Sequence, residues 1–213
     1  MAAIAFYAAR IANKGLNTWN RQLKGGSEYD LARRILKCTY RWREALANVR
    51  NPLITSEEQP SPSPEKAKDM THLELSEYGV ATAYQNRWDK VVAIRDELRA
   101  ELLEAEALWD DTFVKSFEPL FDLQHKLFST LHAYLRARNP SEHPDSRKVY
   151  QEIYMKGDAI MYRSFSKDVP DQFGSEVDAG IKIIEAHLKP HLREMAVEGW
   201  MEMIRKRASS LMS

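Results

Sequence analysis

Two histidines near the carboxyl end of the chain have the spacing of a metal site. His187 and His191 are four residues apart, which directs two imidazole rings to the same side of a helix. Glu194 follows three residues later and offers a third ligand, so a metal-dependent enzyme is one interpretation. Pro190 disturbs the helix between the histidines, and no Glu follows His187 as it does in zinc proteases. An ordinary, half-exposed helix face is therefore the favoured interpretation of the pair.

Other catalytic signatures are weaker. Asp122 and His125 have the spacing of one half of a di-iron motif, but the remaining carboxylates of such a site are missing. The sequence contains no glycine-rich phosphate loop and no nucleophile elbow. We therefore predict no catalytic residue, no cofactor and no small-molecule substrate. Nucleic-acid binding is disfavoured, because the basic residues do not belong to a recognisable module.

The composition favours a helical protein with a substantial core. The chain of 213 residues has only 8 glycines and many aromatic side chains, which excludes disorder throughout. Its single cysteine, Cys38, suits a reducing compartment and is expected to be buried. The net charge is zero, but residues 1–50 carry +7 and the remainder carries −7. This asymmetry predicts a basic element that lies on an acidic one.

The longest element is a helix expected over residues 71–109. Thr71 and Glu74 form a capping box, and at 1.5 Å per residue the helix would extend about 55 Å. Apolar residues recur along it at steps of three and four, namely Ala81, Tyr84, Trp88, Val91, Leu98, Leu102, Ala105 and Trp109. Arg95 interrupts this stripe at an inward position, where we predict that it fixes the register between helices or reaches the edge with its charged end.

A second stripe follows it and ends at Arg138-Asn139-Pro140. Gln124 stands where an apolar residue is expected, and the stripe consists of Phe113, Phe117, Leu120, Leu127, Leu131 and Tyr134. Residues 71–139 therefore predict either an antiparallel hairpin or a continuous, kinked rod. Further helices are expected over 144–165, with Val149 and Ile153 on the apolar face, and over 172–208.

The amino-terminal part predicts two helices and a linker. Residues 27–52 form a helix that Ser27 caps and that Asn51-Pro52 ends, and it belongs to one domain with 71–213. Residues 53–70, rich in Pro, Ser and Glu, are expected to be an extended, exposed spacer without helix.

Residues 1–26 predict a basic amphipathic helix that the tandem glycines at 25 and 26 end. It contains no acidic residue, and its apolar run before Arg10 is too short to span a bilayer. It would dock on the bundle, lie on a membrane surface, or be a processed presequence. The expected membrane or partner face consists of Ile4, Ile11, Leu16, Trp19 and Leu23 with Arg10, Lys14, Arg21 and Lys24.

Several segments resemble a group of uncharacterised bacterial all-helical proteins. The similarity lies in the run from Trp19 to Ala32, in Val49-Arg50-Asn51-Pro52, in Arg87-Trp88 and in Leu102 to Trp109, and it extends over about residues 15–192. The resemblance implies a bacterial origin and a helical bundle, with a hydrophobic segment that often precedes the tryptophan. The apolar segment in this chain is shorter, and the resemblance implies no activity.

Together these observations predict an all-α protein, an elongated helical bundle built on a long antiparallel helical hairpin with an amphipathic N-terminal helix. We expect a non-enzymatic interaction or scaffold protein, with a protein partner or self-association through helical stripes. Its expected location is cytoplasmic, with contact to the inner face of the membrane through the N-terminal helix as a further expectation.

Overall fold

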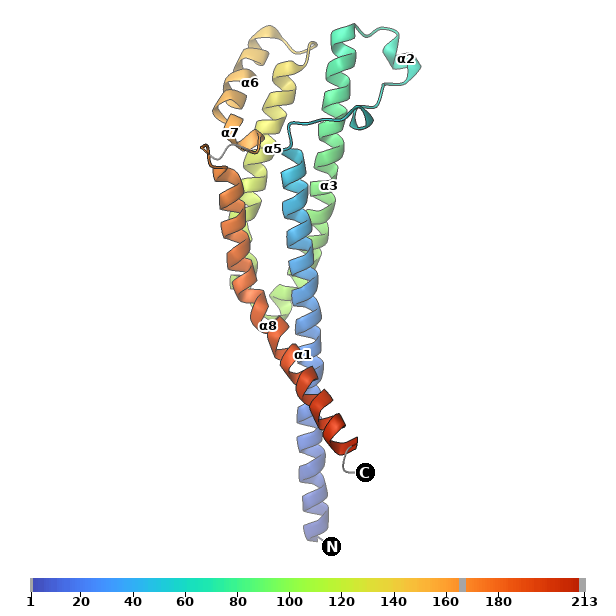
Figure 1. Ribbon diagram of the computed structural model, residues 1–213, viewed down its shortest axis with the longest axis vertical. Coiled ribbons are helices and arrows are strands. Elements are labelled where there is room, and N and C mark those ends of the chain that lie inside the picture. The colour runs from blue at the N-terminus through green and yellow to red at the C-terminus, as the bar shows by residue number, and fades with distance from the viewer. Residues whose placement is uncertain (1, 165–167, 211–213) are drawn as a thin grey trace.

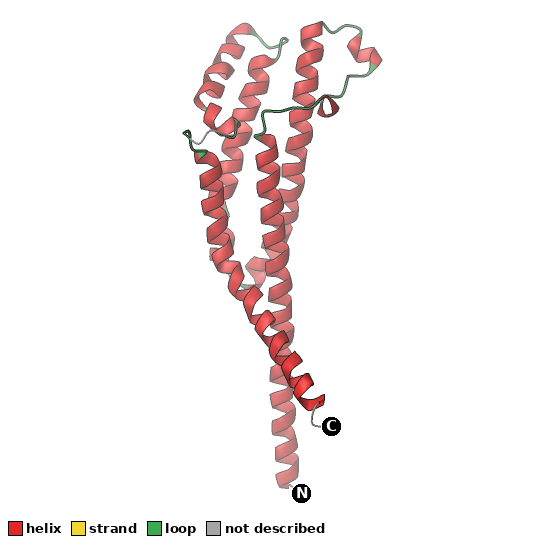
Figure 2. Ribbon diagram, viewed as in Figure 1, coloured by secondary structure: helices red, strands yellow, loops and turns green. Residues whose placement is uncertain are grey.

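The computed structural model is all-α in the part of the chain that it describes. It describes the backbone of residues 2–164 and 168–210, and the side chains of residues 25–164 and 168–192. Within these ranges there are helices and turns but no strand (Figure 2). The long helices are α1 (Ala2–Val49), α3 (His72–Leu108), α5 (Glu118–Arg138) and α8 (Gln172–Ser210). Between them lie the shorter elements η1 (Ser56–Glu58), α2 (Pro64–Ala67), α4 (Asp111–Lys115), α6 (Pro144–Lys156) and α7 (Asp158–Met161).

The long helices lie along the long axis of the molecule, and the start of α1 and the end of α8 are at the same end of it (Figure 1). Arg138 at the end of α5 donates to Glu77 near the start of α3 at 2.7 and 2.6 Å. The rings of Tyr84 and Tyr134 pack edge to face with their centroids 5.7 Å apart. These contacts place the end of α5 near the start of α3.

Local capping explains where these helices begin and end. The Thr71 hydroxyl accepts the Glu74 backbone N–H, and the Glu74 carboxylate accepts the Thr71 backbone N–H, which confirms the predicted capping box. The Asp110 carboxylate accepts the Phe113 backbone N–H at 3.0 Å and starts α4. Both Arg-Asn-Pro tripeptides end a helix as predicted. In each one the asparagine oxygen accepts a backbone N–H two residues later.

The core is formed by the predicted apolar stripes. Cys38 is buried, as expected, and burial raises the pKa of its thiol. The other large buried side chains come from all four long helices and include Leu31, Ile35, Trp42, Tyr84, Val91, Leu98, Leu102, Phe117, Leu120, Leu127, Ile181 and Ile184. Val149 and Ile153 of α6, expected on an apolar face, are exposed instead. Helix α6 packs on α5 mainly through aromatic rings.

The predicted helix break at residues 25 and 26 is wrong. Helix α1 continues from Ala2 to Val49, so Ser27 caps nothing and no boundary separates 1–26 from 27–52. Neither glycine has a positive φ. Glycine permits a left-handed stop without requiring one, and its cost inside a helix is only about 1 kcal/mol relative to alanine. Packing of the residues from Leu31 onward against α3 and α8 stabilises the helix beyond the glycines.

The prediction of an extended spacer over 53–70 is also wrong in part. Ser56–Glu58 forms a 3-10 turn, and Pro64–Ala67 forms one helical turn with Pro64 at its first position. Glu58 is held by Arg87 of α3, so this stretch is fastened to the helices at one point. Much of the remaining stretch is exposed.

The expected contact between a basic and an acidic element is present between α1 and α3. Arg34 pairs with Glu101 and Glu104 at 2.8 and 2.5 Å, and Arg41 pairs with Glu97 at 2.5 Å. Glu101 is 23 % exposed and the other side chains are about half exposed, so we expect each pair to add little stability. The pairs show that the charges of α1 and α3 are complementary along this contact.

Candidate functional site

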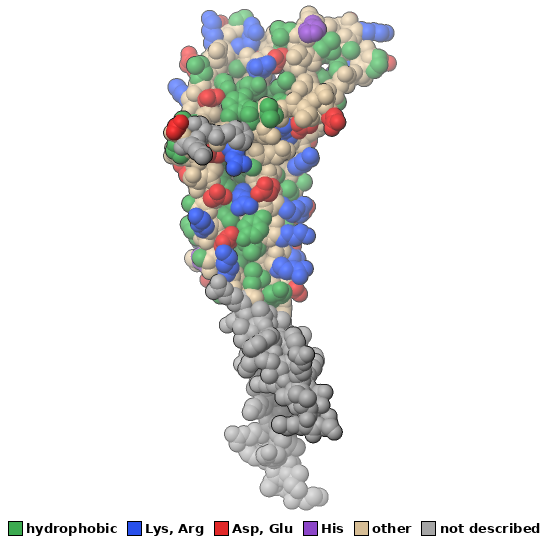
Figure 3. Space-filling model, in the orientation of Figure 1, with side chains coloured by type: hydrophobic (Ala, Val, Ile, Leu, Met, Phe, Trp, Pro, Cys, Tyr) green, Lys and Arg blue, Asp and Glu red, His purple; other side chains and the backbone are tan. Residues whose placement is uncertain are grey.

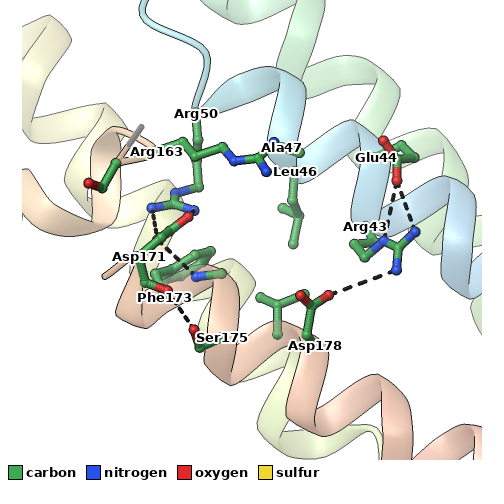
Figure 4. A pocket seen from close by; sticks show the side chains of 13 residues that line it. Arg43, Glu44, Leu46, Ala47, Arg50, Arg163, Asp171, Phe173, Ser175 and Asp178 are labelled. Atoms are coloured by element: carbon green, nitrogen blue, oxygen red, sulfur yellow. Dashed lines mark hydrogen bonds and ion pairs between the residues drawn. The ribbon is translucent and has the colours of Figure 1, made fainter. Parts of the chain in front are cut away.

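A hollow with many polar side chains lies between the carboxyl end of α1 and the start of α8 (Figure 4). Arg50 lies in it and is only 3 % exposed. Its guanidinium donates to both oxygens of Asp171, at 2.8 and 2.7 Å, and its flat side lies over the Phe173 ring. It also donates to the backbone carbonyls of Ala159, Ile160 and Tyr162.

This hollow is therefore a structural junction. All of the nitrogens of Arg50 are engaged, and Asp171 also accepts the Gly174 backbone N–H and thereby caps α8. Burial opposes ionisation of Asp171, but the bonds from Arg50 and the Gly174 N–H outweigh it and lower the pKa of this carboxyl. Nearby, Arg43 pairs with Glu44 and lies 3.8 Å from Asp178. Because its cations and carboxylates pair with one another, the junction offers little to an outside ligand.

A second buried arginine, Arg87 of α3, contacts the carboxyl end of α1. Arg87 of α3 is 2 % exposed and donates to both carboxylate oxygens of Glu58 at 2.8 Å. It also donates to the carbonyls of Asn48, in the last turn of α1, and of Asn51 and Leu53, which follow the end of that helix. A cation at a helix carboxyl end also interacts favourably with the helix dipole. Neither Arg50 nor Arg87 is among the site residues that the sequence pattern predicts, although Arg50 begins an Arg-Asn-Pro tripeptide.

The predicted histidine pair packs against the turn between α3 and α4. The His191 ring stacks on Trp109 at 4.7 Å between centroids, and its Nδ1 lies 3.3 Å from Glu28. His187 has its Nδ1 3.0 Å from its own helix at the Ile183 carbonyl. The Glu194 side chain lies outside the described residues. In the described part of the chain, no three His, Cys, Asp or Glu side chains form a group that could hold a metal ion.

The predicted membrane or partner face, from Ile4 to Lys24, also lies outside the described side chains. Only its backbone is described, as the first half of α1. Within the range for which side chains are described, no helix has the length and apolar character needed to cross a bilayer.

A groove runs along α1 on the side where it meets α3. Apolar side chains form its floor and mainly basic side chains form its rim. We call it the α1 groove, and define it by Leu36, Tyr40, Ala45 and Ile94 (floor) and Arg33, Lys37, Arg41, Lys90, Glu44 and Asn48 (rim). Glu44, the one acid in this lining, pairs with Arg43. Its volume is about 700 Å³. Figure 3 shows Lys and Arg side chains in a column beside a band of hydrophobic side chains on the face drawn. Arg33, Lys37 and Lys90 form no ion pair with any described residue.

A smaller hollow lies between α3 and α5. We call it the α3–α5 recess; its volume is about 330 Å³, and it is lined by Trp88, Arg95, Arg99, Phe121, Gln124, His125 and Phe128. Arg95 does face α5 here, but its hydrogen bonds go to the adjacent Asp96, at 3.2 and 3.0 Å. These bonds do not join two helices, so the register-fixing role predicted for Arg95 remains a prediction. The polar bond that crosses the core runs instead from Trp42 to Gln124, at 2.7 Å.

Comparison of the chain with family models, with characterised proteins and with solved structures found no match. The resemblance to uncharacterised bacterial helical proteins therefore remains a prediction.

Proposed function

We propose that this chain is a non-enzymatic helical interaction protein. In this proposal it is an elongated bundle built on an antiparallel hairpin of α3 and α5, and it acts in the cytoplasm by binding another protein through the α1 groove. The observation that carries the proposal is the groove itself, an apolar floor with a basic rim whose charges are incompletely matched. Exposed apolar surface with a polar rim is typical of protein-binding sites.

The shape and charge of the groove favour one kind of partner, an amphipathic helix with acidic residues beside its apolar stripe. The groove follows α1 from Arg33 to Asn48, which corresponds to about four turns and a length of roughly 22 Å. A helix of similar length would place apolar side chains on Leu36, Ala45 and Ile94. Its acidic residues would meet Arg33, Lys37 and Lys90, which also steers the encounter.

Fluorescence anisotropy tests this proposal with the full chain and a labelled synthetic helix of about 20 residues, made of Leu at helical spacing and Glu elsewhere. We expect saturable binding that weakens about tenfold or more in the double variant Arg33→Glu, Lys37→Glu, because each substitution places like charges in contact. The matched control is Lys126→Glu, Lys148→Glu, on the exposed surfaces of α5 and α6.

Three results would contradict the proposal: no binding of the acidic peptide, equal binding of a peptide with Lys in place of Glu, or equal weakening by the control variant. Sedimentation equilibrium of the protein without peptide measures its oligomeric state and so tests whether a second copy of this chain occupies the α1 groove. A dimer that the Arg33→Glu, Lys37→Glu variant dissociates would show that the groove binds this chain itself and would contradict the choice of an acidic helix.

We further propose that residues 2–24 bind a membrane surface. The support is compositional, since this stretch combines basic and apolar residues and lacks acidic ones. Flotation with anionic vesicles should recover the full chain and lose the variant Arg10→Glu, Lys14→Glu, Arg21→Glu. Equal flotation of the two proteins would exclude this part of the proposal.

A further inference from the structure

The two polar interruptions of the apolar stripes in α3 and α5 lie at the same place. Arg95 replaces an apolar residue in the stripe of α3, and Gln124 replaces one in the stripe of α5. Both line the α3–α5 recess. The stripes on either side of each interruption are buried, so the recess is the point at which the seam between these helices becomes polar.

The orientation of the Gln124 amide is fixed by its neighbour. The indole N–H of Trp42 can only donate, so the amide atom that faces it at 2.7 Å is the oxygen. The amide nitrogen therefore points away from Trp42, and its two N–H donors have no hydrogen-bond partner among the described residues. Gln124 is only 5 % exposed. Among the described residues its amide nitrogen is not one of the fully buried nitrogens without a partner, so these donors retain solvent access and are available to a ligand in the recess.

Two cations line the same recess as this amide. Arg95 uses Nε and Nη2 to bond Asp96, which leaves Nη1 without a bond to a described residue. Arg99 lies over the Phe121 ring, 5.4 Å from Cζ to the centroid, and has no ion pair within the described range. No carboxylate lines the recess, and Asp96 is the only acidic residue bonded to these arginines in the described part of the chain. The donors thus outnumber the acceptors, which favours an anion.

The remaining lining consists of aromatic rings, those of Trp88, Phe121 and Phe128, and of the His125 imidazole. The Trp88 and Phe128 rings pack with their centroids 5.0 Å apart, and Trp88 is buried whereas Phe128 is 41 % exposed. Small-molecule sites commonly combine such aromatic walls with a few convergent polar groups, in volumes from about 300 Å³ upward. The recess has this composition at the lower end of that size range.

We propose that the α3–α5 recess binds a small carboxylate that carries a planar apolar body. The carboxylate accepts from the Gln124 amide and from Arg95 and Arg99, and the planar body packs on Trp88 and Phe128. This site is independent of the α1 groove, because the two share no lining residue. Its ligand is small, so it adds a binding activity to the proposed interaction with a protein.

Phenylacetate is a suitable probe, since it has one carboxylate and one aromatic ring. With about ten non-hydrogen atoms, its expected Kd is on the order of millimolar. Binding to the full chain is measured by calorimetry and by the shift of the Gln124 side-chain amide resonances in ¹⁵N spectra. Two compounds serve as controls: 2-phenylethylamine has the ring with a positive charge, and acetate has the carboxylate without the ring.

Two variants test the donors. Arg95→Gln, Arg99→Gln removes both cations, and Gln124→Glu keeps an oxygen for Trp42 while replacing the amide donors by a negative charge. Each should weaken phenylacetate binding by about tenfold or more. The control variant Arg33→Gln, Lys37→Gln removes two cations from the α1 groove and should leave binding unchanged. If Gln124→Glu fails to fold, the arginine variant decides.

The proposal is overturned if phenylacetate does not saturate the protein at about 20 mM, if 2-phenylethylamine binds as tightly, or if the arginine variant binds within twofold of the original chain. If the protein does not bind phenylacetate but still binds the acidic peptide, the proposal for the α3–α5 recess is wrong and that for the α1 groove stands.

Discussion

Trp42 in α1 donates its indole N–H to the side-chain oxygen of Gln124 in α5 across 2.7 Å, and both side chains are buried. This bond joins two helices that are 82 residues apart at this point in the sequence. It satisfies the indole and orients the amide at the α3–α5 recess. The core bond and the proposed ligand site therefore depend on the same residue.

Removing either partner of this bond should destabilise the protein. In Gln124→Leu the buried indole N–H loses its acceptor, which we expect to cost about 1–3 kcal/mol. Trp42→Phe leaves the amide oxygen unpaired and also removes buried volume, so it should cost more. The double variant should cost less than the sum, because neither polar group remains. Urea unfolding of the four proteins measures this coupling, and strictly additive losses would show that the bond contributes nothing.

Arg50→Met should lower the free energy of unfolding by about 3–5 kcal/mol, since the Asp171 carboxylate, which is only 18 % exposed, would lose its cation. Arg41→Met is the control. It also breaks an arginine–carboxylate ion pair, but the side chains of both Arg41 and its partner Glu97 are about half exposed. The control should cost far less. Chemical unfolding compares the two, and equal losses would contradict the assigned role of Arg50.

The pair of Arg87 and Glu58 should make stability depend on pH in the acidic range. The hydrogen bond from Arg87 lowers the pKa of Glu58 from 4.5 to about 2, against the opposing effect of burial. A carboxyl whose pKa is lower in the folded state stabilises the fold above its unfolded pKa. This contribution is lost as pH falls from about 4.5 to 2. Between pH 6 and pH 2, Glu58→Gln should therefore lose less unfolding free energy than the original chain. If the free energy of unfolding fell equally with pH in the original chain and in Glu58→Gln, the Arg87–Glu58 pair would not be the cause of the pH dependence.

The heptad pattern predicts the core because it depends only on the period of the helix. Tyr84, Val91 and Leu98 are buried as the spacing indicates, and so are Leu120 and Leu127. Side-chain direction follows from helical geometry alone. The two interrupted positions were also visible in the sequence.

The meeting of those two positions could not be derived from the sequence. Arg95 and Gln124 face one recess only because α3 and α5 pack in one particular register, which no short-range pattern encodes. The burial of Arg87 likewise depends on how helices distant in the sequence pack together. Its partners are the carbonyls of residues 48–53, which are 34 to 39 positions away in the sequence. An arginine that caps another helix has no local signature.

The break predicted at the tandem glycines shows a different limit. Glycine at a helix end and glycine inside a helix look identical in the sequence, and packing against neighbouring helices decides between them. The difference has a measurable consequence, because a left-handed glycine resists substitution whereas a helical one does not.

Gly26→Ala should therefore stabilise the protein, by about 0.5–1 kcal/mol. Gly26 does not have a positive φ, and a Cβ at this position would have nothing within 4 Å. The same substitution at Gly157 is the matched control with the opposite sign, because its Cβ would lie 2.6 Å from the Thr130 hydroxyl oxygen. Thermal unfolding and amide hydrogen exchange over residues 20–30 measure both effects. Slower exchange and a higher Tm in Gly26→Ala, with a lower Tm in Gly157→Ala, would agree with one continuous α1. Destabilisation by Gly26→Ala would instead mean that residue 26 adopts a left-handed conformation and that the helix ends there, because only such a backbone penalises the added methyl group in open space.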